Sequence, residues 1–122
     1  MCRAEQITKL IKSLSTTTPD IEAAAVVDND GLMMASSLPQ DVDEDSVAAM
    51  SSALQGISER IASELKRGSF ELVMVRGGEG FAILTRCSDE AVLSVLTSKN
   101  AKLGLIFLDV KRAAADIGKL LR

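Results

Sequence analysis

Three stretches of the chain carry apolar residues at helical spacing, with polar residues between them. The first runs from Arg3 to Leu14 and is ended before Thr18-Pro19, because proline disfavours helix in the residue that precedes it. The second follows the acidic run Asp41 to Asp45, which favours a helix N-terminus, and stops near Gly68. The third begins near Asn100 and continues to the C-terminus.

Between these helices the chain is rich in β-formers and tight turns. Ile21 to Val27 and Leu32 to Ser36 flank Asp28-Asn29-Asp30-Gly31, which predicts a hairpin because Asn, Asp and Gly tolerate positive φ. Three further strands follow the second helix, and Gly77-Gly78-Glu79 joins the first two of them in another hairpin. These strands are Phe70 to Arg76, Gly80 to Arg86 and Ala91 to Thr97.

The order helix, hairpin, helix, three-stranded meander, helix predicts an α/β (α+β) fold with a five-stranded antiparallel sheet. It is expected to form one domain over residues 1–122. The last three strands are apolar on both faces, since Leu72 and Met74 alternate with Val73 and Val75. Both faces of the sheet are therefore expected to be covered by helices.

The central helix has one apolar stripe with small residues on the neighbouring faces. The stripe continues over about five turns and is expected to pack on the helix's own sheet. It consists of Val47, Met50, Leu54, Ile57, Ile61 and Leu65. The small residues would let another helix approach closely, which favours a second buried side; packing onto the same sheet is the alternative. They are Ala48, Ala49, Ser51, Ser52, Ala53 and Gly56.

Composition narrows the classes of function. The 122 residues include no histidine, which removes Ser-His-Asp and Cys-His catalysis and the commonest zinc ligand. A net charge of −3 and the lack of Trp and Tyr disfavour nucleic-acid binding. No segment approaches the roughly 18 apolar residues of a membrane span. We therefore expect a cytoplasmic protein without enzymatic activity, cofactor, metal, nucleic-acid partner or direct membrane insertion.

Several polar patterns could indicate a binding site, but each is better explained by a structural role. Asp28 and Asp30 could bind a hard cation, but turn formation accounts for them. The run Asp41 to Asp45 could face a basic partner, although helix capping explains most of it. Gly77 to Gly80 looks like a phosphate loop, yet it joins two strands and lacks a following helix. Cys2 and Cys87 are expected to be free thiols, with redox sensing by Cys87 as the alternative.

The chain resembles the roadblock-type dynein light chain family, in its MglB-like bacterial and archaeal branch. The resemblance lies in the joint order and spacing of three stretches, which are Ile21 to Ser36, Ser46 to Gly68 and Glu71 to Leu121. The resemblance implies a roadblock/profilin-like sheet, with the central helix on one face and the N- and C-terminal helices on the other. It also implies a protein without catalytic residues that forms dimers. Such dimers bind or regulate small Ras-like GTPases, or serve as scaffolds.

In dimers of this kind the central helix pairs with its mate, and the following strand continues the sheet across the interface. Carried onto this chain, the interface would comprise Met50, Ala53, Leu54, Gly56, Ile57, Arg60, Leu72, Val73, Met74 and Val75. Arg60 and Arg67 are the candidate contacts to a GTPase, as finger-like cations; solvated helix decoration is the alternative. Two other functions remain open: a nucleotide-independent adaptor in a motor or signalling complex, and a small-molecule sensor.

Overall fold

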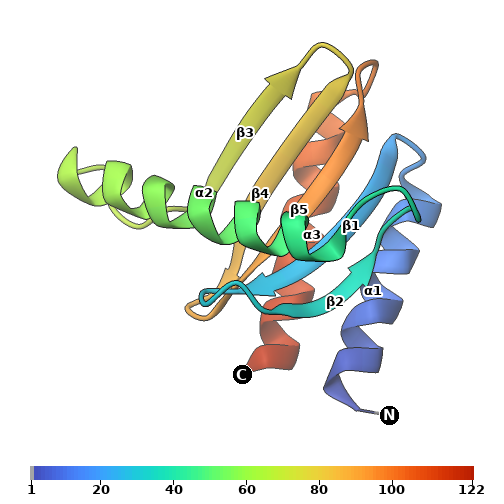
Figure 1. Cartoon of the computed structure of the whole chain (residues 1–122), viewed down its shortest axis with the longest axis horizontal. Helices are drawn as coiled ribbons and strands as arrows, with labels where there is room; N and C mark the ends of the chain where they lie inside the picture. The colour runs from blue at the N-terminus through green and yellow to red at the C-terminus, as the bar shows by residue number, and fades with distance from the viewer. Residues whose placement is uncertain (1) are drawn as a thin grey trace.

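A computed structural model describes residues 2–122 and contains the predicted elements in the predicted order (Figure 1). They are α1 (Arg3–Thr17), β1 (Ile21–Asp28), β2 (Met33–Ser37), α2 (Glu44–Glu64), β3 (Leu72–Gly77), β4 (Gly80–Ser88), β5 (Ala91–Ser98) and α3 (Leu103–Leu121). The boundaries differ slightly from the pattern, since α1 continues past Leu14 and Phe70 precedes its strand. The five-stranded antiparallel α+β fold is confirmed.

The strands are ordered β2-β1-β5-β4-β3, and all neighbours are antiparallel. Both predicted hairpins form, and Gly31 adopts the positive φ of 86° that the first turn requires. The long-range pairing of β1 with β5, with Val26 opposite Leu93, joins the N-terminal hairpin to the C-terminal meander. This pairing leaves β2 and β3 as the two edges of the sheet.

The helices divide between the two faces of the sheet (Figure 1). Helices α1 and α3 lie side by side on one face and bury the larger core, in which Ile11, Leu93 and Ile117 are fully enclosed. Helix α2 crosses the other face over a smaller core formed by Val27, Ala48, Phe70, Leu84 and Val92. Its C-terminal half projects beyond the β3 edge of the sheet.

Close packing of α3 on β4 depends on Gly118. A Cβ at this position would overlap the carbonyl oxygen of Cys87, which belongs to the backbone and cannot swing away. We expect Gly118→Ala to lower the free energy of unfolding by about 1–3 kcal/mol through overpacking, although alanine is the better helix former. Urea unfolding measures the effect. Gly104→Ala is the matched control in the same helix, because nothing in the described chain lies within 4 Å of a Cβ there. Equal stability gains in both variants would contradict the close contact.

Candidate functional site

Helix α2 presents its large apolar side chains to solvent rather than to its own sheet. Met50, Ile57 and Ile61 are 64%, 58% and 53% exposed, and Leu65 is exposed as well. The side chains that face the sheet are small or polar, namely Ala48, Ser51, Gln55 and Ser58. The prediction that the apolar stripe packs on its own sheet is therefore wrong for most of its length; only Val47 and Leu54 are half-buried. The small residues lie underneath because they let α2 approach the strands closely.

The edge strand β3 is also apolar and open. It pairs with β4 on one side and is the last strand of the sheet. Leu72 and Val75 are 41% and 49% exposed, and Met74 is exposed too, whereas Val73 packs against the small core under α2. The expectation that both faces of the sheet are covered is wrong at this strand, because α2 and α3 lie over the strands further inside.

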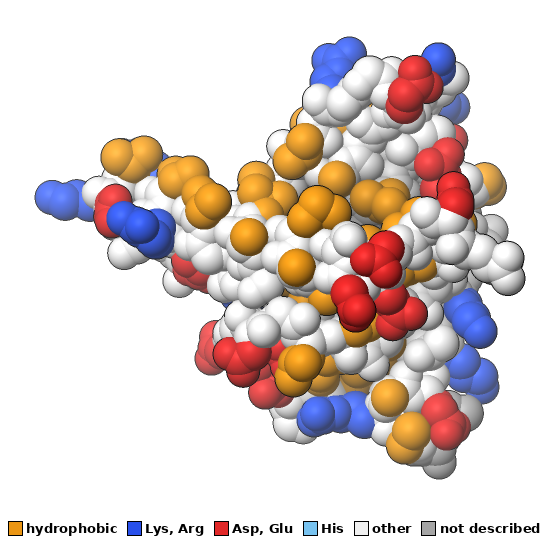
Figure 2. Space-filling model, in the orientation of Figure 1, with side chains coloured by type: hydrophobic (Ala, Val, Ile, Leu, Met, Phe, Trp, Pro, Cys, Tyr) orange, Lys and Arg blue, Asp and Glu red, His pale blue; other side chains and the backbone are white. Residues whose placement is uncertain are grey.

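The exposed apolar side chains of α2 and of β3 lie next to each other, and we call them the α2–β3 surface. It consists of Met50, Ile57, Ile61 and Leu65 of α2 and Val75 on the same side of β3, with Leu72 and Met74 on the opposite face of that edge strand. Figure 2 shows its hydrophobic side chains running along α2 and continuing beside it. Contiguous apolar patches of this kind on a globular protein mark interaction sites. A groove with a volume of about 340 Å³ opens between α2 and the strands; Val47, Leu54, Val75 and Leu96 are among the residues that line it.

The structure brings the ten predicted interface residues onto α2 and β3. Ala53, Gly56 and Arg60 are exposed on the solvent side of α2, and Leu54 and Val73 are half-buried. Arg60 pairs with Glu64 at 3.2 Å, and Nε of Arg67 donates to the carbonyl oxygen of Leu65 at 3.0 Å. Both arginines are exposed. The sequence does not predict that Ile61 and Leu65 belong to the exposed surface, because the spacing of apolar residues does not tell which side of the helix the sheet covers.

A polar cluster around Arg86 attaches α2 to the end of the sheet. The guanidinium of Arg86 forms an ion pair with Glu59 of α2 and donates to Oδ1 of Asn29 at 3.0 Å. It also stacks over the ring of Phe70, 5.6 Å from the centroid. Ser52 on α2 donates to the carbonyl oxygen of Asn29 at 3.1 Å. We call Asn29, Ser52, Glu59 and Arg86 the α2 clasp; sequence analysis missed it because its members come from separate elements.

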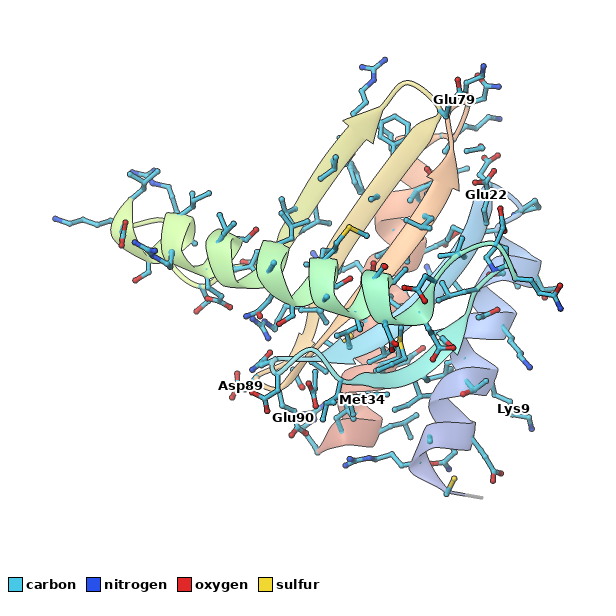
Figure 3. The ribbon with its side chains drawn as sticks, viewed as in Figure 1. Lys9, Glu22, Met34, Glu79, Asp89 and Glu90 are labelled. Atoms are coloured by element: carbon cyan, nitrogen blue, oxygen red, sulfur yellow. The ribbon has the colours of Figure 1, made fainter. Side chains whose placement is uncertain are left out.

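Asn29 links the clasp to the β4–β5 turn. Its backbone N–H donates to the carbonyl oxygen of Glu90, and its side-chain amide donates to that of Asp89 at 2.7 Å. Figure 3 shows Asp89 and Glu90 beside one another in that turn. The neighbouring Asp28 accepts hydrogen bonds from the backbone N–H groups of Asp30 and Leu32, both at 2.9 Å. These bonds give Asp28 the turn-forming role that the sequence predicts.

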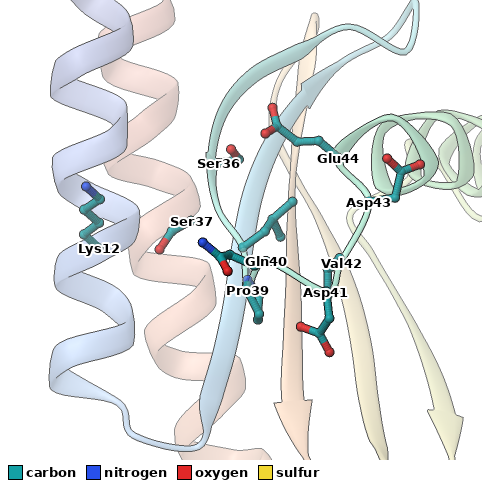
Figure 4. A pocket seen from close by; sticks show the side chains of 10 residues that line it. Lys12, Ser36, Ser37, Pro39, Gln40, Asp41, Val42, Asp43 and Glu44 are labelled. Atoms are coloured by element: carbon teal, nitrogen blue, oxygen red, sulfur yellow. The ribbon is translucent and has the colours of Figure 1, made fainter.

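The start of α2 is capped as the sequence predicts. Asp43 accepts hydrogen bonds from the hydroxyl of Ser46 at 2.6 Å and from its backbone N–H at 3.1 Å. These bonds, the hydroxyl one first, hold the pKa of Asp43 below its usual value because they favour the charged carboxylate. Asp41 and Glu44 also line the polar cleft of about 620 Å³ between this loop and Lys12 of α1 (Figure 4).

The two cysteines differ in environment, so their reactivities are expected to differ. Burial raises the pKa of the Cys87 thiol to about 12, which outweighs the opposite influence of Arg86. Cys2 is exposed. We expect iodoacetamide at pH 8 to modify Cys2 readily and Cys87 at least about tenfold more slowly, because the thiolate is the reactive form. Mass spectrometry of the time course measures this, with urea-unfolded protein as the control. Equal rates in folded protein would support the redox alternative.

The described chain holds neither a cluster of metal ligands nor a helix that could span a membrane. Among residues 2–122, no group of three or more Cys, Asp or Glu side chains is arranged to hold a metal ion. Across the same residues, no helix combines the length and the apolar character needed to cross a membrane.

The fold combines an antiparallel sheet with a central helix that is exposed beside an open edge strand. The Roadblock/LC7 domain family model matches residues 7–97, and the chain belongs to this family. The proteins MJ1340 and MJ0310 of Methanocaldococcus jannaschii are each 42% identical over 100 residues, which is 82% of this chain and 87% of each relative.

Solved structures show the same fold. MglB of Myxococcus xanthus superimposes with a TM-score of 0.90 at 20% identity, over 97% of this chain and 89% of that one. A Roadblock/LC7 domain from Streptomyces avermitilis gives 0.87 at 17% identity, over 93% of this chain and 96% of that one. A profilin from Acanthamoeba castellanii gives 0.62 at 18% identity, over 92% and 97% of the two chains. The roadblock/profilin-like fold is thereby confirmed.

Proposed function

We propose that the protein is a cytoplasmic, non-catalytic dimer that binds and regulates a small Ras-like GTPase. The observation that carries this proposal is the α2–β3 surface, because folding leaves its large apolar side chains exposed. Membership of the Roadblock/LC7 family and the MglB-like fold support the GTPase as the class of partner. No residue of this chain is assigned a chemical step.

The dimer uses the central helix and the edge strand. An unpaired strand edge offers backbone N–H and C=O groups to a further strand, so β3 can continue the sheet into a second copy. The exposed residues of α2 then meet their counterparts across the two-fold axis. The proposed contacts are Met50, Ala53, Leu54, Gly56, Ile57, Arg60, Leu72, Val73, Met74 and Val75.

Regulation follows from a choice between the conformations of the partner. A binding protein shifts an equilibrium only by its difference in affinity for the two states, so this dimer would prefer either the GTP-bound or the GDP-bound form. Arg60 and Arg67 are the proposed contacts, since both are exposed and Arg60 forms a weak surface pair with Glu64. Stimulation of hydrolysis would come from positioning of the GTPase's own groups.

A nucleotide-independent adaptor is the second candidate function. In the proposed dimer the second copy covers the α2–β3 surface, so an adaptor would bind its partners through the remaining exposed surface and would need no nucleotide. The regulator is expected to bind its partner in one nucleotide state, whereas the adaptor is expected to bind its partners whether GTP or GDP is present. One binding experiment with each nucleotide therefore distinguishes the two functions.

Affinity capture tests the proposal. The protein, fixed to beads, is incubated with lysate of its source organism in the presence of a non-hydrolysable GTP analogue or of GDP. We expect a small GTPase to be retained in one of the two conditions and lost in the other. An identical set of partners in both, with no GTPase among them, would contradict the proposed regulator and favour the adaptor. Beads carrying Ile57→Arg protein report whether capture requires the α2–β3 surface.

A further inference from the structure

The outward side of α3 carries large apolar side chains that the rest of the described chain leaves uncovered. Leu105 and Leu108 are 57% and 53% exposed, whereas Ile106 and Val110 on the inward side are buried. The two leucines are three residues apart, so they lie about one turn apart on the same side of the helix. Helix α3 lies on the face of the sheet opposite α2, and neither leucine belongs to the residues proposed for the dimer (Figure 1).

Basic residues share this face with the leucines. Helices α1 and α3, with the flanking Lys102 and Arg122, hold eight basic and three acidic residues, a net charge of +5. The rest of the chain holds six basic and fourteen acidic residues, a net charge of −8. All eight basic side chains of the two helices are exposed. A protein with a net charge of −3 therefore presents one positive face, on which α1 and α3 lie side by side.

The acidic residues of these helices leave most of the positive charge uncompensated. Asp109 is half-buried, where it accepts a hydrogen bond from the hydroxyl of Thr18 at 2.7 Å and lies 3.9 Å from Arg112. Asp116 is half-buried between the two helices, and Glu5 is exposed. Within residues 2–122, Arg112 is the one basic residue of the face that forms an ion pair. Seven cations of the face are thus available to an external anion.

The helix dipole does not account for this distribution of charge. A cation is favourable in the last turn of a helix, which explains Lys119 of α3. Lys102 is the N-cap of α3 and Arg3 is the first residue of α1, where a positive charge is unfavourable. Lys111 and Arg112 lie near the middle of α3, where the dipole has little influence.

The shape of the face suits a continuous surface better than a single side chain. The hollow between α1 and α3 has a volume of about 600 Å³, opens outward and has Leu10, Leu120 and Lys9 in its lining. The cations are spread along both helices rather than gathered around this hollow. Cations with projecting leucines among them are typical of protein faces that lie in the interface of a negatively charged bilayer.

We propose that α1 and α3 form a docking face for the surface of an anionic phospholipid bilayer. Leu105 and Leu108 enter the boundary between headgroups and acyl chains, and Lys111, Arg112 and Lys119 lie against the lipid phosphates. The chain lies on the bilayer and does not cross it. This site goes beyond the proposed function and does not require it, because it uses no residue of α2 or β3. It directs α2 away from the bilayer, where a soluble partner can reach it.

Vesicle binding tests the proposal. The purified chain is mixed with vesicles of phosphatidylcholine alone, or of phosphatidylcholine with about 30% phosphatidylglycerol, in about 0.1 M salt, and the vesicles are sedimented. We expect the partition coefficient for the anionic vesicles to exceed that for the neutral ones by at least about tenfold, because several cations face the surface. About 1 M salt should remove most of this difference, since the screening length falls to about 3 Å.

Two double variants of equal net charge distinguish the face from the charge of the whole chain. Lys111→Gln with Lys119→Gln removes two cations from the face, and Lys66→Gln with Arg67→Gln removes two beyond the end of α2. We expect the first pair to weaken binding to anionic vesicles by about 20-fold or more, at roughly fivefold for each cation near the surface. The second pair should stay within about twofold of the wild type. All four side chains are exposed, so both variants should fold normally, which circular dichroism checks.

A fluorophore reports whether Leu108 enters the interface. Leu108→Cys is made in a chain with Cys2→Ser and Cys87→Ser and is labelled with a polarity-sensitive dye. We expect its emission to shift to shorter wavelength on anionic vesicles, because the dye leaves water. The control is Ser63→Cys in the same background, since Ser63 is exposed on α2 at the other face of the sheet, and its emission should not shift.

The contrary results are specific. Equal partition into neutral and anionic vesicles, or binding to neither, would overturn the proposal. Equal losses in the two double variants would show that total charge, rather than this face, determines binding. A shift at position 63 and none at position 108 would overturn the orientation on the bilayer. Binding to soluble polyglutamate without binding to anionic vesicles would assign the face to an acidic protein partner and overturn the bilayer as its ligand.

Discussion

Arginine in place of Ile57 is expected to convert the proposed dimer into a folded monomer. Ile57 is 58% exposed in the single chain and lies in the middle of the apolar face of α2. A guanidinium there would be buried in the proposed interface without a carboxylate to pair with. Truncation or charging of a central interface residue costs about 2–4 kcal/mol, which weakens the dimer by roughly 30-fold to 1,000-fold. Sedimentation velocity over a concentration series measures the shift.

The control for this variant is Ser63→Arg. Ser63 is exposed on the same helix but points away from the apolar face, because two residues from Ile61 correspond to about 200° around the helix. The control should sediment like the wild type. Thermal unfolding should leave the single chain of Ile57→Arg within about 0.5 kcal/mol of wild type, since exposed positions contribute little to folding. An unchanged dimer in Ile57→Arg would refute the role of this face.

Removal of the Arg86 side chain is expected to loosen α2 and thereby weaken the proposed dimer as well. The change breaks the ion pair with Glu59 and the hydrogen bond to Asn29, and it exposes the ring of Phe70. Because Glu59 is partly exposed and can be solvated, we expect Arg86→Ala to lower the free energy of unfolding by about 1–2 kcal/mol. Few contacts with the strands otherwise hold α2, so its angle on the sheet should become less defined.

Urea unfolding and sedimentation of Arg86→Ala are compared with those of Arg76→Ala. Arg76 stacks on Phe81 at 5.8 Å but lies exposed on the edge strand, so its loss should cost no more than about 1 kcal/mol. A dimer of wild-type affinity in Arg86→Ala, despite lower stability, would show that the clasp supports folding alone. Wild-type stability in this variant would show that the clasp does not hold α2.

Local sequence patterns predict the helices, strands and turns. The position of the candidate site depends instead on contacts between residues that are far apart in the sequence. The Asp28–Gly31 turn and the Asp43 cap follow from residues that bond within four positions of each other, so the sequence alone predicts them. Whether the apolar stripe of α2 faces the sheet or the solvent depends on which helix residues fit closely against the strands. The spacing of hydrophobic residues along the sequence does not contain that information. The α2 clasp joins Arg86 to residues 27 and 57 positions away, and no local pattern marks such a contact.

The central claim is that this dimer distinguishes the nucleotide states of a small GTPase. Its most direct test is a calorimetric titration of the captured GTPase, loaded with a non-hydrolysable GTP analogue or with GDP, into the wild-type protein. We predict affinities that differ by at least about tenfold between the two states, equivalent to about 1.4 kcal/mol of differential binding. Equal affinities for the two states would contradict the regulator and leave a nucleotide-independent adaptor.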